Sequence, residues 1–174
     1  MQSPSSSSEQ TSKTVQLNTD KSLNIGELAP NFTLQDQYNK THQLTDFAGQ
    51  WIVLYFYPRD ATPICTKQAC ALKDSINAFL NKQAIILGVN ADSIEKHQQF
   101  AQQNNLPFSL LSDPKGEVAR QYGALFDLRW LRFVKRHSFI IDPLGRIAKI
   151  YRSVNAEQHA QTILNDLERL QTAD

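Results

Sequence analysis

The residues best suited to chemistry are two cysteines, Cys65 and Cys70, in a chain of 174 residues. Cys65 follows Pro63, which suits the first position of a helix because a helix leaves that N–H without a partner. Thr62 stands just before it and can cap the helix. In the first turn a cysteine meets unpaired N–H groups and the positive end of the helix dipole, which stabilise a thiolate. Cys65 is therefore a candidate nucleophile, and a small buried apolar residue is the alternative.

The spacing of the two cysteines limits what they can do together. At ~1.5 Å rise and ~100° per residue, helical positions five apart have Cα atoms about 8–9 Å apart, whereas a disulfide tolerates about 4.4–6.8 Å. Cys65 and Cys70 can therefore pair only if the first helical turns unwind. This predicts a redox switch between a helical dithiol and a locally unwound disulfide; the alternative is that Cys70 merely packs. A zinc site is not expected, because two cysteines without a histidine at ligand spacing supply too few ligands.

Local patterns place these cysteines just after a buried strand. The segment from Trp51 to Tyr57 is apolar on both faces, which is typical of a strand covered on both sides, and Pro58 ends it. In open α/β sheets, reactive groups gather at the carboxyl ends of such strands. Apolar residues then recur at intervals of four and three, which predicts a helix that starts near Pro63. These apolar residues are Cys65, Ala69, Leu72, Ile76 and Phe79.

The rest of the chain alternates between strand-like and helix-like segments. The order is strand–helix three times, then a hairpin and a last helix, and it predicts an α/β fold. We expect a mixed central sheet with helices on both faces and a small N-terminal hairpin. The expected segments are a hairpin of 32–34 and 42–44, strands at 84–89 and 106–111, a helix to about 103 opened by a capping box at 92–95, a helix at 114–122, a hairpin of 137–141 and 146–151, and a helix capped by Asn155.

Composition narrows the class of protein. With 41% hydrophobic and 20% charged residues the chain can form a packed core, and a net charge of +1 gives no basic field for nucleic acid. No apolar run approaches the ~20 residues of a membrane span. Residues 1–22 are almost entirely polar and predict a disordered tail, with one domain at 23–174. The tail has neither the basic start nor the apolar stretch of a secretory signal, so we expect a cytoplasmic protein.

The segment from Pro58 to Cys70 resembles the active-site signature of a known family. Pro58-x-x-x-Thr62-x-x-Cys65 is the peroxiredoxin pattern, and its extension to Cys70 is similar to the peroxiredoxin Q branch, also called bacterioferritin comigratory protein. The resemblance runs from about Leu23 to Leu170, and it implies a thioredoxin-like fold. Further matching pieces are residues 26–32, 44–47, 111–113 and 136–142.

The resemblance implies a role for each matching residue. Cys65 is the expected peroxidatic cysteine, which becomes a sulfenic acid, and Cys70 the resolving cysteine of the same subunit. Thr62 is expected to hydrogen-bond the peroxide, Pro58 to shield the pocket, and Arg136 to hold the thiolate and the departing oxygen. The implied substrates are hydrogen peroxide and organic hydroperoxides, with thioredoxin as reductant and no metal or other cofactor. A resolving cysteine within one chain favours a monomer.

Two other functions remain open at this level. One is a thioredoxin-like disulfide reductase, although Thr62 stands where a Cys-x-x-Cys pair needs its first cysteine. The other is a non-catalytic module that binds nucleic acid or a protein through the segment Arg129–Arg136, which the near-neutral charge disfavours.

One segment matches the family poorly, and the histidines belong to no motif. The segment Ala124–Lys135 is expected to be an apolar loop folded partly onto the core, or else a pocket rim or docking surface. Four scattered histidines are expected at the surface rather than as ligands. They are His42, His97, His137 and His159.

Overall fold

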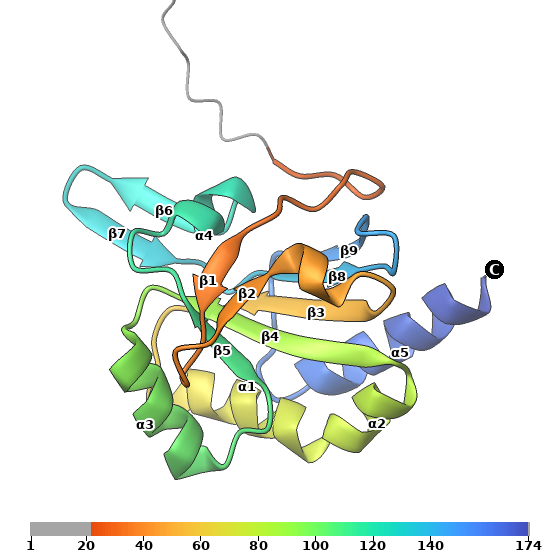
Figure 1. Ribbon diagram of the computed structural model, residues 1–174, viewed down its shortest axis with the longest axis horizontal. Coiled ribbons are helices and arrows are strands. Elements are labelled where there is room, and N and C mark those ends of the chain that lie inside the picture. Colours follow the sequence, from red (N-terminus) through yellow and green to blue (C-terminus); the bar gives the residue numbers. More distant parts are fainter. Residues whose placement is uncertain (1–21, 174) are drawn as a thin grey trace, which may run out of the picture.

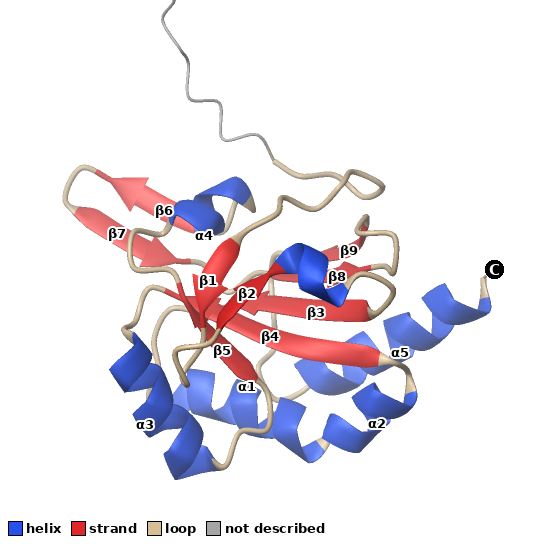
Figure 2. Cartoon of the chain, in the orientation of Figure 1, coloured by secondary structure: helices blue, strands red, loops and turns tan. Residues whose placement is uncertain are grey.

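The structure is a computed structural model that describes residues 22–173, and its centre is a seven-stranded mixed sheet (Figures 1 and 2). The strand order is β2-β1-β5-β4-β3-β8-β9. The first five strands in the chain are β1 (Thr33–Gln35), β2 (Thr41–Gln43), β3 (Trp51–Phe56), β4 (Ala84–Asn90) and β5 (Ser109–Ser112). The last two strands of this sheet are β8 (Ser138–Ile141) and β9 (Ile147–Tyr151).

Strand β3 lies in the middle of this sheet, as its uniformly apolar sequence predicts. It runs parallel to β4, where Val53 pairs with Ile86, and antiparallel to β8, where Tyr55 pairs with Ser138. The residues from Ile52 to Phe56 are buried because both faces of the strand are covered. The end of β3 is thus held between two neighbours, which gives the segment that follows a fixed starting point.

Helices cover both faces of the sheet, as expected for this fold class, but unevenly. Figure 1 shows α1, α2, α3 and α5 on one side and η1 and α4 on the other. The first face buries Val53, Leu72, Phe100 and Ile163 in one core, and the second buries a separate core around Phe56. The helices are α1 (Pro63–Asp74), α2 (Ile76–Asn81), α3 (Ile94–Asn104), α4 (Glu117–Gln121) and α5 (His159–Thr172), and η1 (Leu44–Phe47) is a 3-10 turn.

Three helix boundaries differ from the predicted ones. The apolar stripe through Phe79 continues across two helices, because the backbone at Ser75 leaves the helical conformation between α1 and α2. Ser93 rather than Asp92 caps α3, since its Oγ accepts from the N–H of Lys96. Asn155 caps a turn that precedes α5. Its Oδ1 accepts from the N–H groups of Glu157 and Gln158, and the helix itself starts at His159.

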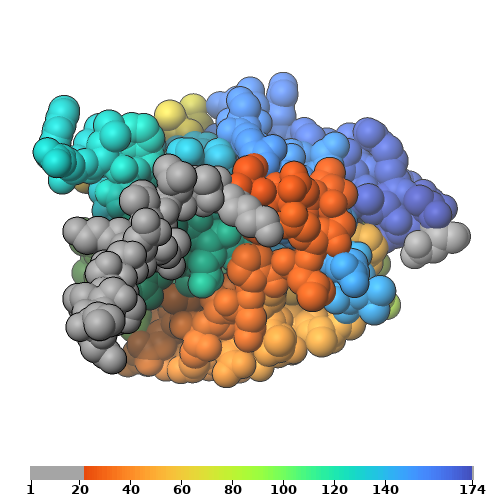
Figure 3. All heavy atoms as spheres, turned by 90° about the horizontal axis from the view of Figure 1, so that it is seen from above, coloured from red at the N-terminus to blue at the C-terminus, as the bar shows by residue number. Residues whose placement is uncertain are grey.

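The segment expected to be an apolar loop is a second, separate hairpin, β6 (Leu125–Leu128) and β7 (Leu131–Val134). Its two ends are buried at Leu125 and Val134, and Phe126 stacks on Phe133 with ring centroids 4.8 Å apart. Trp130 at the tip is 87% exposed. Figure 3 shows the hairpin, in cyan, projecting at one end of the molecule. Because most of the hairpin is exposed, strand pairing across a tight turn and the Phe126–Phe133 stack explain it better than burial does.

The expectation that the histidines lie at the surface is wrong for three of the four. His42, His97 and His159 are buried, and only His137 is partly exposed. Each buried ring has a hydrogen-bond partner, which makes its burial tolerable. For His42 the partner is Asp36, at 2.7 Å from Nε2. The histidines belong to no sequence motif, so nothing in the sequence indicated these hydrogen-bond partners.

The predicted tail, residues 1–22, lies outside the described residues except for Ser22, whose Oγ accepts from Arg152. Leu23, the next residue, is buried. Between residues 22 and 173, no helix is both long and apolar enough to cross a membrane. In the same part of the chain no three His, Cys, Asp or Glu residues gather as metal ligands.

Candidate active site

Cys65 lies at the carboxyl edge of the sheet, in the first turn of α1. The chain leaves β3 at Phe56, passes through Pro58 and Thr62, and enters α1 at Pro63. The Cys65 side chain is buried at 2% exposure, so water has little access to its sulfur. The local pattern of a buried strand followed by a proline that starts a helix predicts this placement correctly.

The guanidinium of Arg136 lies beside the Cys65 sulfur. Its Nη2 donates to Sγ at 3.4 Å and its Nη1 at 3.5 Å. The contact arises from sheet pairing: Phe56 N–H donates to the carbonyl of His137 at 2.7 Å, which joins the end of β3 to the segment before β8. A cation on residue 136 therefore reaches a sulfur on residue 65, although 71 positions separate them in the chain.

Gln68 completes this cluster, and the motif analysis assigned it no role. Its Oε1 accepts from Arg136 Nη1 at 2.9 Å, so one guanidinium contacts both the amide and the sulfur. Gln68 is fully buried, and its Nε2 has no hydrogen-bond partner among residues 22–173. The spacing of Gln68 from Cys65 could have identified it as a site residue, since residues three apart on a helix lie on one face. Gln68 thus orients the guanidinium toward the sulfur.

Thr62 and Pro58 precede the cysteine in the chain, and the hydrogen bonds to its sulfur come from Arg136 instead. Thr62 occupies the N-cap position of α1, but its hydroxyl donates to the carbonyl of Arg59 at 3.3 Å and caps no helical N–H. The predicted side-chain cap is therefore wrong: the hydroxyl donates to a loop carbonyl, but its oxygen accepts from no N–H of α1. Pro58 is half-buried and borders a cavity of about 260 Å³ that Arg132 and Phe133 of the β6–β7 hairpin also line.

Cys70 faces a different neighbour from Cys65. Both are free thiols on α1, and the Cys70 thiol donates to Oδ1 of Asn104, at the end of α3, at 3.8 Å. Cys70 is partly exposed, whereas Cys65 is buried against Arg136. The intact helix therefore holds the two sulfurs in separate environments, as the helical spacing predicts.

A buried histidine, His159, lies next to this cluster. Its Nε2 is 2.8 Å from the hydroxyl of Ser138, the first residue of β8, and its ring packs edge-on against Tyr151. Burial, with a smaller contribution from the charge of Arg136, lowers the pKa of His159 to about 4. The ring is therefore neutral at physiological pH, and Arg136 remains the cation of the cluster.

His159 predicts a specific loss of stability in acid. An unfolded chain protonates this histidine near pH 6.5, whereas the folded protein does so only near pH 4, so the unfolded state binds more protons between these values. The contribution of the neutral His159 ring to the free energy of unfolding is thus present above pH 6.5 and is lost as the pH falls toward 4. The difference between pH 7 and pH 5 is about 2 kcal/mol. Urea unfolding at both pH values should show this slope, and His159→Gln should reduce it; an unchanged slope contradicts the assignment.

The fold and site define a class: a thioredoxin-like fold with a buried, cation-paired cysteine at a helix start. Comparison with known proteins agrees. Residues 25–150 match the AhpC/TSA family. The chain is 38% identical over 150 residues to "Peroxiredoxin Bcp" of Bacillus subtilis (strain 168), which covers 83% of this chain and 95% of the relative. It is 39% identical over 146 residues to "Peroxiredoxin Q, chloroplastic" of Triticum aestivum, which covers 83% and 67%.

Solved structures give the same result. The "Peroxidoxin BcpB" structure from Mycobacterium tuberculosis superposes with a TM-score of 0.80 at 32% identity, over 84% of this chain and 97% of that one. A mutant PrxQ from Xylella fastidiosa gives 0.81 at 28% identity, over 86% and 98%. The chain belongs to the AhpC/TSA family, in its peroxiredoxin Q, or bacterioferritin comigratory protein, branch. It is accordingly a thiol-dependent peroxidase.

Proposed function

We propose that this enzyme reduces hydrogen peroxide and organic hydroperoxides with Cys65 as the peroxidatic cysteine. Cys70 of the same subunit is the resolving cysteine, and thioredoxin or a similar dithiol protein is the reductant. The observation that carries the proposal is the double contact from Arg136 to the buried Cys65 sulfur, at 3.4 and 3.5 Å. A permanent cation held there favours the thiolate, which is the reactive form of cysteine.

In the first step the Cys65 thiolate attacks one peroxide oxygen. An S–O bond forms with the sulfur's electron pair as the O–O bond breaks, so sulfur is oxidised to a sulfenic acid. The other oxygen leaves as hydroxide or alkoxide and takes a proton from water. Arg136 stabilises the charge that develops on that oxygen, and Thr62 hydrogen-bonds the peroxide once its hydroxyl turns away from the Arg59 carbonyl. Pro58 shields the pocket.

In the second step the Cys70 thiolate attacks the sulfenic sulfur. The disulfide forms, and the hydroxyl leaves as water after gaining a proton. Because Cα atoms five apart in a helix are about 8–9 Å apart, the first turns of α1 must unwind, and the Cys70 thiol must leave Asn104. The dithiol reductant then reduces the disulfide by thiol–disulfide exchange and is itself oxidised to a disulfide, which returns both cysteines to thiols.

The same proposal makes the enzyme a cytoplasmic monomer that needs no metal or other cofactor. Both sulfurs of the cycle come from α1 of one chain, so the chemistry requires no second subunit. The rival disulfide reductase lacks a first cysteine at position 62, which holds threonine. A binding module that is not an enzyme is inconsistent with membership of a peroxidase family.

Replacement of the resolving cysteine tests this cycle. We expect reduced Cys70→Ser to consume about one equivalent of peroxide per chain, because Cys65 still forms a sulfenic acid, and then to stop. Thioredoxin-supported turnover should fall to background when it is measured as the oxidation of NADPH by thioredoxin reductase. Asn104→Ala is the matched control, since it removes the partner of the Cys70 thiol but leaves both sulfurs.

Mass spectrometry of the oxidised wild-type protein completes the test. A peptide pair that joins Cys65 to Cys70 within one chain is the expected result. Undiminished turnover in Cys70→Ser, or a crosslink between two chains, contradicts the assignment of Cys70 as the resolving residue of the same subunit.

A further inference from the structure

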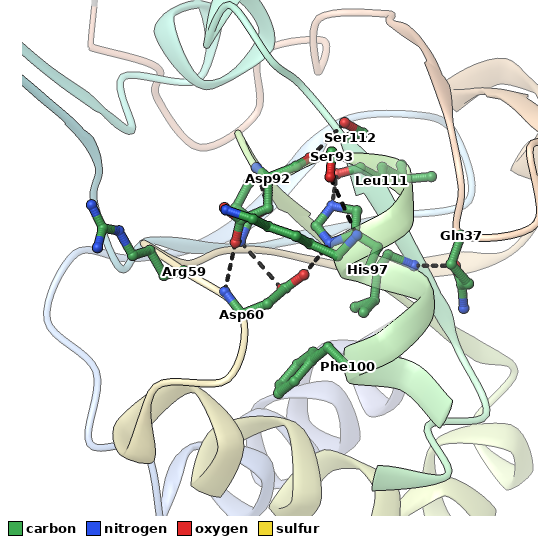
Figure 4. Close-up of polar contacts among 12 residues, drawn as sticks. Gln37, Arg59, Asp60, Asp92, Ser93, His97, Phe100, Leu111 and Ser112 are labelled. Atoms are coloured by element: carbon green, nitrogen blue, oxygen red, sulfur yellow. Dashed lines mark hydrogen bonds and ion pairs between the residues drawn. The ribbon is translucent and has the colours of Figure 1, made fainter. Parts of the chain in front are cut away.

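Asp60, in the active-site loop of residues 58–62, forms a buried side-chain pair with His97 of α3. Figure 4 shows His97 of α3 facing Asp60 of the loop, with Nδ1 at 2.5 Å from Oδ2. The two side chains are 0% and 4% exposed. The other ring nitrogen, Nε2, lies 3.2 Å from the carbonyl of Leu111 in β5. Each ring nitrogen thus faces an oxygen, so His97 bridges Asp60 of the loop and the backbone of β5.

Asp60 is held by several other groups besides His97. Its Oδ1 accepts from the hydroxyl of Tyr57 at 2.6 Å and from Asn90 Nδ2 at 3.4 Å, and its own N–H donates to Asp92 Oδ2 at 2.7 Å. Burial raises the pKa of Tyr57, so its hydroxyl stays protonated and can donate. The carboxylate of Asp60 is thus tied to the end of β4, to α3 and to the residue after β3, and its backbone N–H is tied to the loop before α3.

The residue after Asp60 shows what this anchoring does. Ala61 has a φ of 59°, in the left-handed region that a residue with a Cβ rarely adopts. The chain reverses there and enters Thr62, the N-cap of α1, three residues before Cys65. Since an unanchored alanine relaxes to a right-handed or extended backbone, the fixed position of Asp60 holds the strained turn in place.

We propose that His97 is a positioning residue for peroxide reduction, and that it acts through Asp60 to hold the loop of residues 58–62 in its reactive shape. The side-chain hydrogen bonds of His97 go to Asp60 and Leu111 and not to Cys65, Thr62 or Arg136, so its effect passes through the Ala61 turn. The inference rests on the proposed function, in which that loop presents Thr62 to the peroxide. A loop that leaves this shape misplaces Thr62 and the start of α1, and small misplacements of reacting groups slow a reaction strongly.

Two substitutions at position 97 separate its two contacts. In His97→Asn the amide nitrogen takes the place of Nδ1 and keeps a donor for Asp60, whereas in His97→Gln it takes the place of Nε2 and keeps a donor for Leu111 only. We expect His97→Gln to slow the oxidation of Cys65 by hydrogen peroxide, measured by stopped flow in a single turnover, by about ten- to a hundredfold. His97→Asn should stay closer to the wild-type rate.

A second substitution tests the route through the turn. Glycine adopts the left-handed backbone without the penalty that alanine bears. Adding Ala61→Gly to His97→Gln should therefore raise the oxidation rate about two- to fivefold above that of His97→Gln alone. Ala61→Val should slow the otherwise unchanged protein, and it can fold because residue 61 is exposed. Ser93→Ala is the control for a general weakening of α3, since it removes that helix's cap but not the contact between His97 and Asp60.

The outcomes distinguish this inference from the proposed function. A wild-type rate in His97→Gln, no recovery with Ala61→Gly, or an equal loss in Ser93→Ala overturns the positioning role. If wild-type Cys65 itself is not oxidised by peroxide, the proposed function fails first, independently of His97.

Discussion

Cys65→Ser is expected to abolish peroxide consumption. A serine hydroxyl stays protonated at neutral pH and cannot form the sulfenic acid on which the cycle depends. Loss of a catalytic nucleophile typically costs at least about a thousandfold, so the rate should fall to that of the uncatalysed reaction. Stopped-flow mixing of the reduced variant with hydrogen peroxide measures the rate directly.

The control for Cys65→Ser is the loss of the other thiol. Cys70→Ser carries the same chemical change on the same helix but should keep one rapid turnover. Thermal unfolding of both variants excludes a folding defect as the cause. If Cys65→Ser still consumes peroxide above background while Cys70→Ser does not, the roles of the two cysteines are reversed.

Arg136→Gln is expected to have the second largest effect. The substitution removes the cation that contacts the Cys65 sulfur through both Nη atoms, and it removes the donor to Gln68. Fixed donors of this kind at a developing anion typically contribute about a hundred- to a thousandfold to the rate. The second-order rate constant for Cys65 oxidation should fall by that factor.

Arg136→Lys separates the charge of residue 136 from its shape. A lysine ammonium keeps the positive charge but cannot offer two parallel donors to the sulfur and a third contact to Gln68, so we expect a loss intermediate between wild type and Arg136→Gln. Arg59→Gln is the matched control, because Arg59 is an exposed arginine on the active-site loop. Equal losses in Arg59→Gln and Arg136→Gln contradict a specific role for Arg136 and indicate a general effect of surface charge.

Local sequence patterns sufficed for the parts of this protein that short-range forces govern. The apolar segment from Trp51 is a buried strand, and Pro63 starts a helix that places Cys65 in its first turn, because burial and helix-start preferences act between near neighbours in the chain. The same spacing on one helix keeps Cys65 and Cys70 apart. The family motif added the expectation for Arg136, which no periodicity indicated.

The tertiary structure alone decided which distant groups meet. The contact of Arg136 with Cys65 depends on the antiparallel pairing of β3 with β8, and the contact of His97 with Asp60 depends on how α3 packs on the sheet. Burial of His97 and His159 also follows from such packing, of α3 beside β5 and of α5 against β8. These contacts join residues far apart in the chain, so their energies come from sheet register and packing that no local pattern records.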